Sequence, residues 1–401
     1  MSKIVIIGGG IIGQFCAYYL AGNGNQVSVI DDNPDMTPAS EGNCGLVTPS
    51  HIVPLNSMQA VFQGIKWLGK KDAPLKIKPQ LDRRFILWFL NFIRFSSGSA
   101  IEKATAARHE LLQLSFSLYE RFFEDEPTES EWNKGGLLYV CRNKKSMNHY
   151  DEEIALHKKF NLQSRMLSAT EVTEEEPLLK GTFAGGALME MDSWLNPTQL
   201  LKDLRRINEI NGVKYCPEKV RDFRLSNGKI NAAMTEKGEY IADEFILATG
   251  ASSPLLAAKI GINLAVIPGK GYNLTTRNGE HIPMKRPLYM VEKKVVATPW
   301  KNGFRIGSTM EFSGYDLELN GDRLNALKKA AGEYLEIDVD SFAFTPWAGW
   351  RPMKDNGIPI IERNEKIKNL VIATGHSMVG LSMAPATGYM VNELITGKKR
   401  D

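Results

Sequence analysis

The chain has 401 residues, of which 43% are hydrophobic and 24% charged, and its formal net charge is +3. This length allows roughly two to three domains, and the composition is typical of a globular protein with a sizeable core. The near-neutral charge makes nucleic-acid binding an unfavoured function. The spacing of the four cysteines does not match a disulfide framework or a metal site. No apolar run approaches the ~18 residues of a membrane-spanning helix, and we expect a cytoplasmic protein.

The first predicted elements are a buried strand over 3–7, a helix starting at Gly10, and a strand over 26–30 that ends at Asp31. The intervening GGGIIG carries Gly8, Gly10 and Gly13 in the spacing of a dinucleotide-binding turn. The helix amides would face a pyrophosphate, and the Asp31 carboxylate could accept hydrogen bonds from ribose hydroxyls. At this point both FAD and NAD are open.

Residues 53–123 are predicted to be mostly helical, and strand-like runs follow near 136–140 and 182–190. A helix over 197–211 is expected to start at Asn196, with Pro197 in its first turn. Asn-Gly at 227–228 and Lys-Gly at 237–238 predict hairpins, and a further helix is expected near 322–335.

The strand over 244–247 leads into Ala248, Thr249 and Gly250, which resembles the second dinucleotide motif of FAD-containing oxidoreductases. A third strand, 369–375, is followed by a helix over 380–395. The positive end of that helix could stabilise negative charge on a flavin. Parallel-strand signals at the beginning, middle and end of the chain predict one nucleotide domain built from separate segments.

Taken together, the chain resembles the FAD-dependent D-amino-acid dehydrogenase/oxidase family, within the D-amino-acid oxidase and glycine oxidase superfamily. Besides the motifs above, the resemblance is carried by PASEGNCGLVTP (38–49), PGKGYNLT (268–275), FRIGSTMEF (304–312), WAGWRPMKDNGIPIIE (347–362) and GHSMVGLSMAPATG (375–388). The early segment is most similar to the dehydrogenase branch, and the last one is closer to glycine oxidases.

The resemblance implies an α/β (α+β overall) fold. A discontinuous Rossmann-like FAD domain of the glutathione-reductase type would comprise 1–55, 196–260 and 346–401. A substrate domain with a mixed or antiparallel sheet would comprise 56–195 and 261–345, with a helical region over 56–125. Sarcosine-oxidase relatives attach FAD to a cysteine near 349–356, where this chain has none, so we expect non-covalent FAD.

The family pattern also implies which residues contact the cofactor. These are Gly8, Gly10, Ile11, Gly13, Asp31, Asp32, Ser40, Asn43, Gly45, Leu46, Val220, Ala248, Thr249, Gly250, Gly375, His376, Val379, Gly380, Leu381 and Ser382. No metal ligand and no catalytic acid or base is expected, since the flavin itself receives the hydride.

For the substrate, the resemblance points to Arg351, whose planar guanidinium matches a carboxylate. The alternative is a buried structural salt bridge. Met310 is a candidate pocket residue, although a core methionine is equally compatible with the sequence. Relatives place a tyrosine just before the position of Pro299. The strand here lacks one, and Tyr272 or Tyr289 could substitute.

The implied reaction is oxidative deamination of a D-amino acid, such as D-alanine, D-proline or hydroxy-D-proline. Hydride passes from the α-carbon to flavin N5, and the imine is hydrolysed to a 2-oxo acid and ammonia. The alternatives are a glycine/sarcosine-type oxidase that uses O2 and a non-catalytic flavin-binding module. Electrons would go to a quinone of an electron-transfer chain or to O2.

The segment RRFILWFLNFIRF, 83–95, has two interpretations. It could lie in a membrane interface, which would place the protein peripherally on the inner face of the cytoplasmic membrane. We favour a buried helix, because aromatic stretches more often belong to a core.

Overall fold

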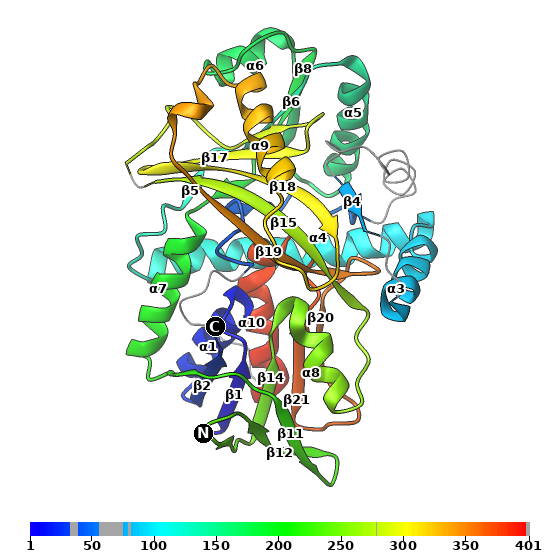
Figure 1. The fold of residues 1–401 in the computed structure, drawn as a ribbon, viewed down its shortest axis with the longest axis vertical. Helices are drawn as coiled ribbons and strands as arrows, with labels where there is room; N and C mark the ends of the chain where they lie inside the picture. Colours follow the sequence, from blue (N-terminus) through cyan, green and yellow to red (C-terminus); the bar gives the residue numbers. More distant parts are fainter. Residues whose placement is uncertain (33–38, 56–74, 79–81, 278, 398–401) are drawn as a thin grey trace.

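The computed structural model describes residues 1–32, 39–55, 75–78, 82–277 and 279–397. Two halves are stacked along the long axis of the molecule, and each is built around one large sheet (Figure 1). The fold is the mixed α/β arrangement that the sequence predicts.

The sheet of the lower half has six strands. Their order is β10 (Lys214–Pro217), β2 (Gln26–Asp31), β1 (Lys3–Ile7), β14 (Glu244–Leu247), β21 (Leu370–Thr374) and β20 (Ile360–Arg363). All neighbours are parallel except β20, which runs antiparallel to β21. The three central strands come from the beginning, middle and end of the chain, and all three are apolar because both faces of the sheet are covered.

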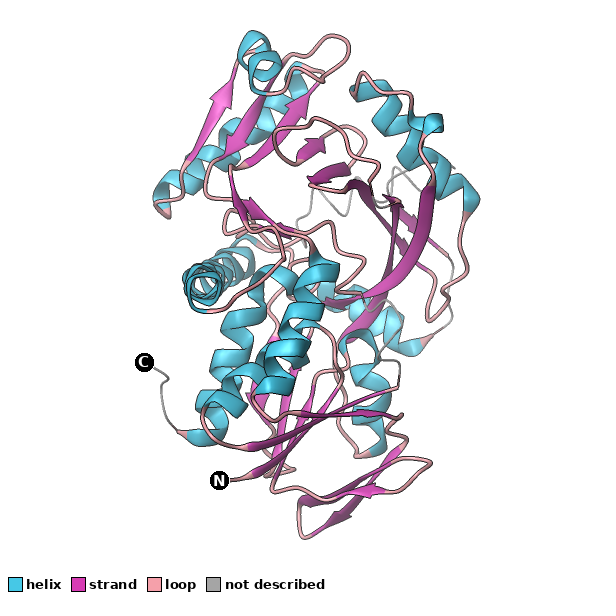
Figure 2. Ribbon diagram, turned by 90° about the vertical axis from the view of Figure 1, so that its left-hand side faces the viewer, coloured by secondary structure: helices cyan, strands magenta, loops and turns pink. Residues whose placement is uncertain are grey.

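Helices cover one face of this sheet, and Figure 2 shows them to one side of it. They are α1 (Ile11–Gly22) and α10 (Gly380–Thr396), and α7 (Pro197–Ile210) packs against α1. As predicted, α7 begins at Asn196, whose side chain accepts a hydrogen bond from the amide of Gln199, with Pro197 in the first turn. The other face is covered by α8 (Ser253–Lys259) and by a small sheet of β11 (Asp222–Ser226), β12 (Lys229–Met234) and β13 (Glu239–Tyr240).

The upper sheet has nine strands and is mixed. Their order is β19 (Phe344–Lys354), β15 (Val266–Thr276), β18 (Gly303–Phe312), β17 (Val295–Trp300), β16 (Leu288–Met290), β6 (Leu137–Cys141), β8 (Gly185–Met189) and β7 (Ser164–Leu167), with β4 (Leu75–Ile77) beside β18. Because β19 pairs with β15 along its whole length, the domain boundary predicted at 346 falls inside a strand of this sheet.

Further elements flank the upper sheet or join the halves. They are β3 (Leu46–Val47), β5 (Asn133–Lys134), β9 (Ser193–Trp194), α3 (Arg83–Arg94), α4 (Gly98–Asp125), α5 (Lys144–Lys159), α6 (Ala169–Glu175), α9 (Gly321–Tyr334) and the 3-10 turns Gly250–Ser252 and Val339–Ser341. One face of the sheet packs on α9, and α5 packs on the β6–β8 part of the other face. In the predicted helical region 56–125, α3 and α4 are helices, whereas β4 is a strand, and 56–74 and 79–81 lie outside the described residues.

Candidate functional site

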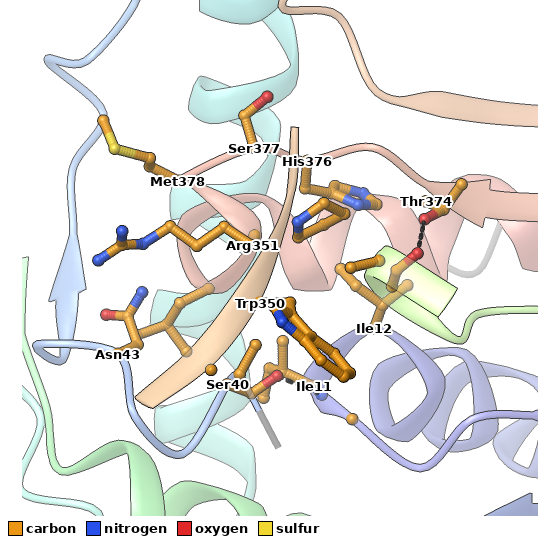
Figure 3. A pocket seen from close by; sticks show the side chains of 18 of the residues that line it. Ile11, Ile12, Ser40, Asn43, Trp350, Arg351, Thr374, His376, Ser377 and Met378 are labelled. Atoms are coloured by element: carbon orange, nitrogen blue, oxygen red, sulfur yellow. Dashed lines mark hydrogen bonds between the residues drawn. The ribbon is translucent and has the colours of Figure 1, made fainter. Parts of the chain in front are cut away.

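A cavity of about 1010 Å³ lies between the two halves. Its wall runs from the loop after β1, past the ends of β14 and β21, to the upper sheet. Figure 3 shows its central part, where side chains from α1, β19 and the segment before α10 converge.

The glycine-rich turn has no room for side chains at two positions. Gly8 has a φ of +107°, and a Cβ there would lie 2.5 Å from the carbonyl oxygen of Ala248. A Cβ on Gly13 would overlap the carbonyl oxygen of Gly8. The turn therefore packs tightly against β14 and presents its backbone to the cavity, as a phosphate-binding turn requires.

The acidic residues at the end of β2 lie at the same end of the cavity. One Asp31 oxygen accepts a hydrogen bond from the amide of Gly9, 2.5 Å away. The Asp32 carboxylate is exposed and forms an ion pair with Lys219. Asp31 thus braces the turn while also facing the cavity.

The loop from Ser40 to Thr48 is attached to both flanking helices. Ser40 Oγ accepts a hydrogen bond from the amide of Ile11 at 3.0 Å. Ser382, in the first turn of α10, accepts one from the Thr48 amide at 3.0 Å and donates to the carbonyl of Leu46 at 3.2 Å. These bonds fix the middle wall of the cavity relative to the starts of α1 and α10.

The ends of β14 and β21 meet below this wall. Thr374 Oγ1 donates to the carbonyl of Gly250 at 2.9 Å, a contact drawn in Figure 3. His376 is buried, and burial lowers its pKa to about 3, so the ring is neutral. Its Nε2 lies 2.9 Å from Thr387 Oγ1, which itself donates to Met383 O. The threonine oxygen therefore accepts from His376 Nε2–H, which leaves Nδ1 without a proton.

The structure gathers most of the predicted cofactor residues along one cavity. Those in the wall are Gly8, Gly10, Ile11, Asp31, Asp32, Ser40, Asn43, Leu46, Val220, Ala248, Thr249, Gly250, His376, Val379, Gly380, Leu381 and Ser382. Gly13, Gly45 and Gly375 lie behind it, and the last two have positive φ, which makes them turn positions.

Arg351 projects into the cavity from β19, between Asn43 and Met378 in the view of Figure 3. Its Nη1 donates to the carbonyl of Thr309 at 2.8 Å. Among the described residues, no carboxylate lies within 4.0 Å of this guanidinium. Within the described part of the chain, Arg351 therefore does not form the structural salt bridge that the sequence left open. Burial lowers the pKa of Arg351, yet arginine remains charged.

Met310 and Tyr272 do not line the cavity. The Met310 sulfur lies 3.7 Å from Arg351 Nη1 and belongs to an apolar cluster that includes Trp88 of α3. Tyr272 is buried in the core beneath α9 and donates to Glu311 Oε2 at 3.0 Å. Their predicted contact with the substrate stays a prediction.

The upper end of the cavity contains polar residues that sequence reasoning did not bring together. They are His51, Arg108, Tyr139, Tyr150, Glu153 and Tyr289. His51 Nε2 is hydrogen bonded to the hydroxyl of Tyr139, and burial lowers the His51 pKa to about 4. Tyr139 and Tyr289 occupy paired positions on neighbouring strands, 150 residues apart in the sequence, so no local signal could relate them.

Known proteins resemble this chain along nearly its whole length. A family model described as FAD dependent oxidoreductase matches residues 3–394. A D-amino acid dehydrogenase of Granulibacter bethesdensis is 28% identical over 99% of this chain and 96% of its own length. One of Helicobacter pylori is 27% identical over 98% and 94%.

Solved structures share the fold. A glycine oxidase from Bacillus cereus superposes with a TM-score of 0.77 at 20% identity, covering 100% of this chain and 99% of its own. An L-proline dehydrogenase from P. horikoshii superposes with a TM-score of 0.74 at 21% identity, covering 100% and 94%.

The cavity fits FAD. The crowded glycine turn offers backbone amides to a pyrophosphate, and a carboxylate stands at the end of β2 for a ribose. The first turn of α10 faces the middle of the cavity, where its dipole favours negative charge. In the described part of the chain, no three His, Cys, Asp or Glu side chains converge as metal ligands would.

Proposed function

Since the chain belongs to the FAD dependent oxidoreductase family, we propose that it oxidises an amino acid, specifically a D-amino acid, in this cavity. The observation that carries the proposal is Arg351. A guanidinium that has no carboxylate partner among the described residues and projects into this cavity suits a ligand that supplies the carboxylate. The D-amino acid dehydrogenases that match along nearly the whole chain support the same substrate class.

We assign the cofactor positions as follows. The turn at Gly8, Gly10 and Gly13 would hold the pyrophosphate, and Asp31 would accept hydrogen bonds from a ribose. Leu46, His376 and the start of α10 would surround the isoalloxazine. Bound FAD supplies the acceptor for the hydride that leaves the substrate α-carbon.

The residues of this chain bind and orient rather than transfer protons. Arg351 would hold the substrate carboxylate and so fix the α-carbon. His51 and His376 have pKa values of about 4 and 3 because both are buried. Both rings are therefore neutral in the working range and act as hydrogen-bonding groups. The product would be an imine, which water converts to a 2-oxo acid and ammonia.

An anaerobic titration tests this proposal. D-alanine, D-proline and a wider panel of D- and N-methyl-amino acids would be added to the purified yellow protein, with the L-enantiomers as controls. Bleaching of the flavin by D-amino acids supports the proposal. Arg351→Lys keeps the charge but loses the planar fork, and should raise the KM for the amino acid by roughly 100-fold.

A second candidate is an amine oxidase of the glycine oxidase kind that passes electrons to O2, which the shared fold makes reasonable. We favour a membrane quinone as the acceptor instead. Rapid return of the yellow colour in air after bleaching would indicate the oxidase. Persistence of the bleached state until a quinone or dye is added would indicate the dehydrogenase.

The surface of α3 supports contact with a membrane. Its inner side is anchored by Trp88, which is 4% exposed and donates from Nε1 to Met353 O at 2.9 Å. Its outer side presents apolar side chains that are 37–57% exposed, namely Ile86, Leu87, Leu90 and Ile93. Arginines stand at both ends of the helix. No helix in the described residues is long and apolar enough to cross a bilayer.

We propose that this outer side of α3 rests on anionic lipid at the inner face of the cytoplasmic membrane. The double variant Leu87→Gln/Leu90→Gln should lose co-sedimentation with phosphatidylglycerol vesicles. Leu225→Gln, at an apolar residue 42% exposed on β11, should leave it unchanged. Equal sedimentation of all three proteins would contradict the contact.

A further inference from the structure

The upper end of the cavity is a cage of three tyrosines and one carboxylate. Tyr139 of β6 and Tyr289 of β16 have ring centroids 4.9 Å apart, and Tyr150 of α5 lies 5.0 Å from Tyr139. Glu153, one helical turn after Tyr150, lines the same cavity. Its side chain is 19% exposed.

The Glu153 carboxylate has no hydrogen-bond partner among the described residues. Among the described basic side chains, the one within 4.0 Å of it is His157, whose Nε2 lies 3.9 Å from Oε1. His157 is buried and its pKa is lowered, so it is neutral. Burial raises the pKa of Glu153 to about 7, and the positive charge of Lys294 acts in the opposite direction. Because this carboxylate is largely shielded from water, a cation placed beside it would stabilise its charged form.

Two of the other polar groups around the cage, Arg108 and Asp192, already have hydrogen-bond partners. The Arg108 guanidinium donates to three backbone carbonyls, those of His51, Ile52 and Gly357. Asp192 accepts hydrogen bonds from the amide and hydroxyl of Ser50. Lys294 lies over the ring of Tyr289, 5.8 Å from its centroid, and forms no ion pair within 4.0 Å of a described carboxylate.

We infer that this cage binds a cationic group at the end of the substrate side chain, so that the preferred substrates are D-amino acids with a terminal amino or guanidino group. The inference rests on the proposed function, because Arg351 must hold the α-carboxylate in the same cavity. A carboxylate attracts the cation directly, and the faces of tyrosine rings add a favourable cation–π interaction. Arg351 would thus bind the negative end of the ligand, and Glu153 would bind its positive end.

The decisive comparison uses D-lysine and D-norleucine, which carry the same side-chain carbons and differ in the terminal ammonium. Oxidation would be followed with a dye acceptor. We expect the kcat/KM of the native protein to be about tenfold or more higher for D-lysine. Glu153→Gln should remove this preference by lowering the kcat/KM for D-lysine to about that for D-norleucine. Glu152→Gln, at the exposed neighbour on α5, should keep it.

Inhibition of the native protein provides a test that needs no variant. n-Butylammonium should inhibit the oxidation of D-alanine competitively, and 1-butanol should not. Bleaching by D-norleucine and D-lysine with equal efficiency would overturn the inference while the proposed function stands. So would equal losses for both substrates in Glu153→Gln, because they would place the carboxylate at the α-amino group or in the fold. If no D-amino acid bleaches the flavin, the proposed function itself fails.

Discussion

The guanidinium of Arg351 occupies the space into which a side chain at Gly271 would project. The two residues lie on the paired strands β19 and β15, and a Cβ on Gly271 would overlap the Cζ, Nη1 and Nη2 atoms of Arg351. Gly271, the second glycine of PGKGYNLT, therefore sets where the guanidinium can lie. It thereby also sets where a substrate carboxylate would bind.

Gly271→Ala should displace the guanidinium without removing it. We expect the KM for the amino acid to rise by roughly tenfold or more, because the charge remains but its position is wrong, while the flavin stays bound. Steady-state kinetics and the flavin spectrum would measure both effects. Gly238→Ala is the matched control, since a Cβ there meets no atom within 4 Å. An unchanged KM in Gly271→Ala would show that this packing does not position Arg351.

Gly13→Ala should abolish stable FAD binding. A methyl group at this position would overlap the carbonyl oxygen of Gly8 and push α1 away from β1. The ratio of flavin absorbance to protein absorbance after gel filtration measures retention. Gly98→Ala, at a glycine whose added Cβ would have no atom within 4 Å, should retain FAD like the native protein. Full occupancy of Gly13→Ala would contradict the proposed pyrophosphate position.

The buried Asp192 should make stability depend on pH. Burial raises its pKa from 3.8 to about 8, against the effect of the two hydrogen bonds from Ser50. Between these values the folded protein keeps a proton that the unfolded chain releases, so the stability contributed by this group falls as pH rises through this range. From about pH 5 to about pH 8, the Tm of the native protein should fall relative to that of Asp192→Asn.

Asp151→Asn, at an exposed position of α5, controls for the loss of a surface charge. It should follow the pH profile of the native protein. Parallel Tm profiles for the native protein and Asp192→Asn would show that Asp192 is ionised in the fold.

FAD should be released by denaturation. Cys44 lines the cavity, but burial raises its thiol pKa, which suppresses the thiolate needed for attachment. Acid precipitation should leave all the yellow colour in the supernatant. Colour in the washed pellet would indicate a covalent link.

Local sequence signals predicted the lower half of the molecule well. The glycine turn, the cap at Asn196 and the hairpin at Asn227 are short-range patterns, and each forms the element that it predicts. Arg351 lines the cavity, and its contact with a substrate stays a prediction. The three parallel strands at the centre of the lower sheet could be recognised because each is apolar and followed by glycine.

The upper half was less predictable for a physical reason. Nearly every residue of β15 is buried, so its sequence does not reveal which face each side chain takes, and Tyr272 points into the core. The cage depends on the register between β6 and β16 and on how α5 packs on them. Local residue spacing does not indicate such long-range pairing. From the sequence alone, Glu153 could not be distinguished from a glutamate on the exposed side of a helix.

The most direct test of the central claim is the anaerobic absorbance spectrum of the flavin during titration with D-amino acids. We expect that D-amino acids bleach the native protein, that L-enantiomers do not, and that Arg351→Lys requires roughly 100-fold more substrate for the same bleaching. A flavin that stays oxidised with every amino acid tested, or a native-like titration of Arg351→Lys, would contradict it.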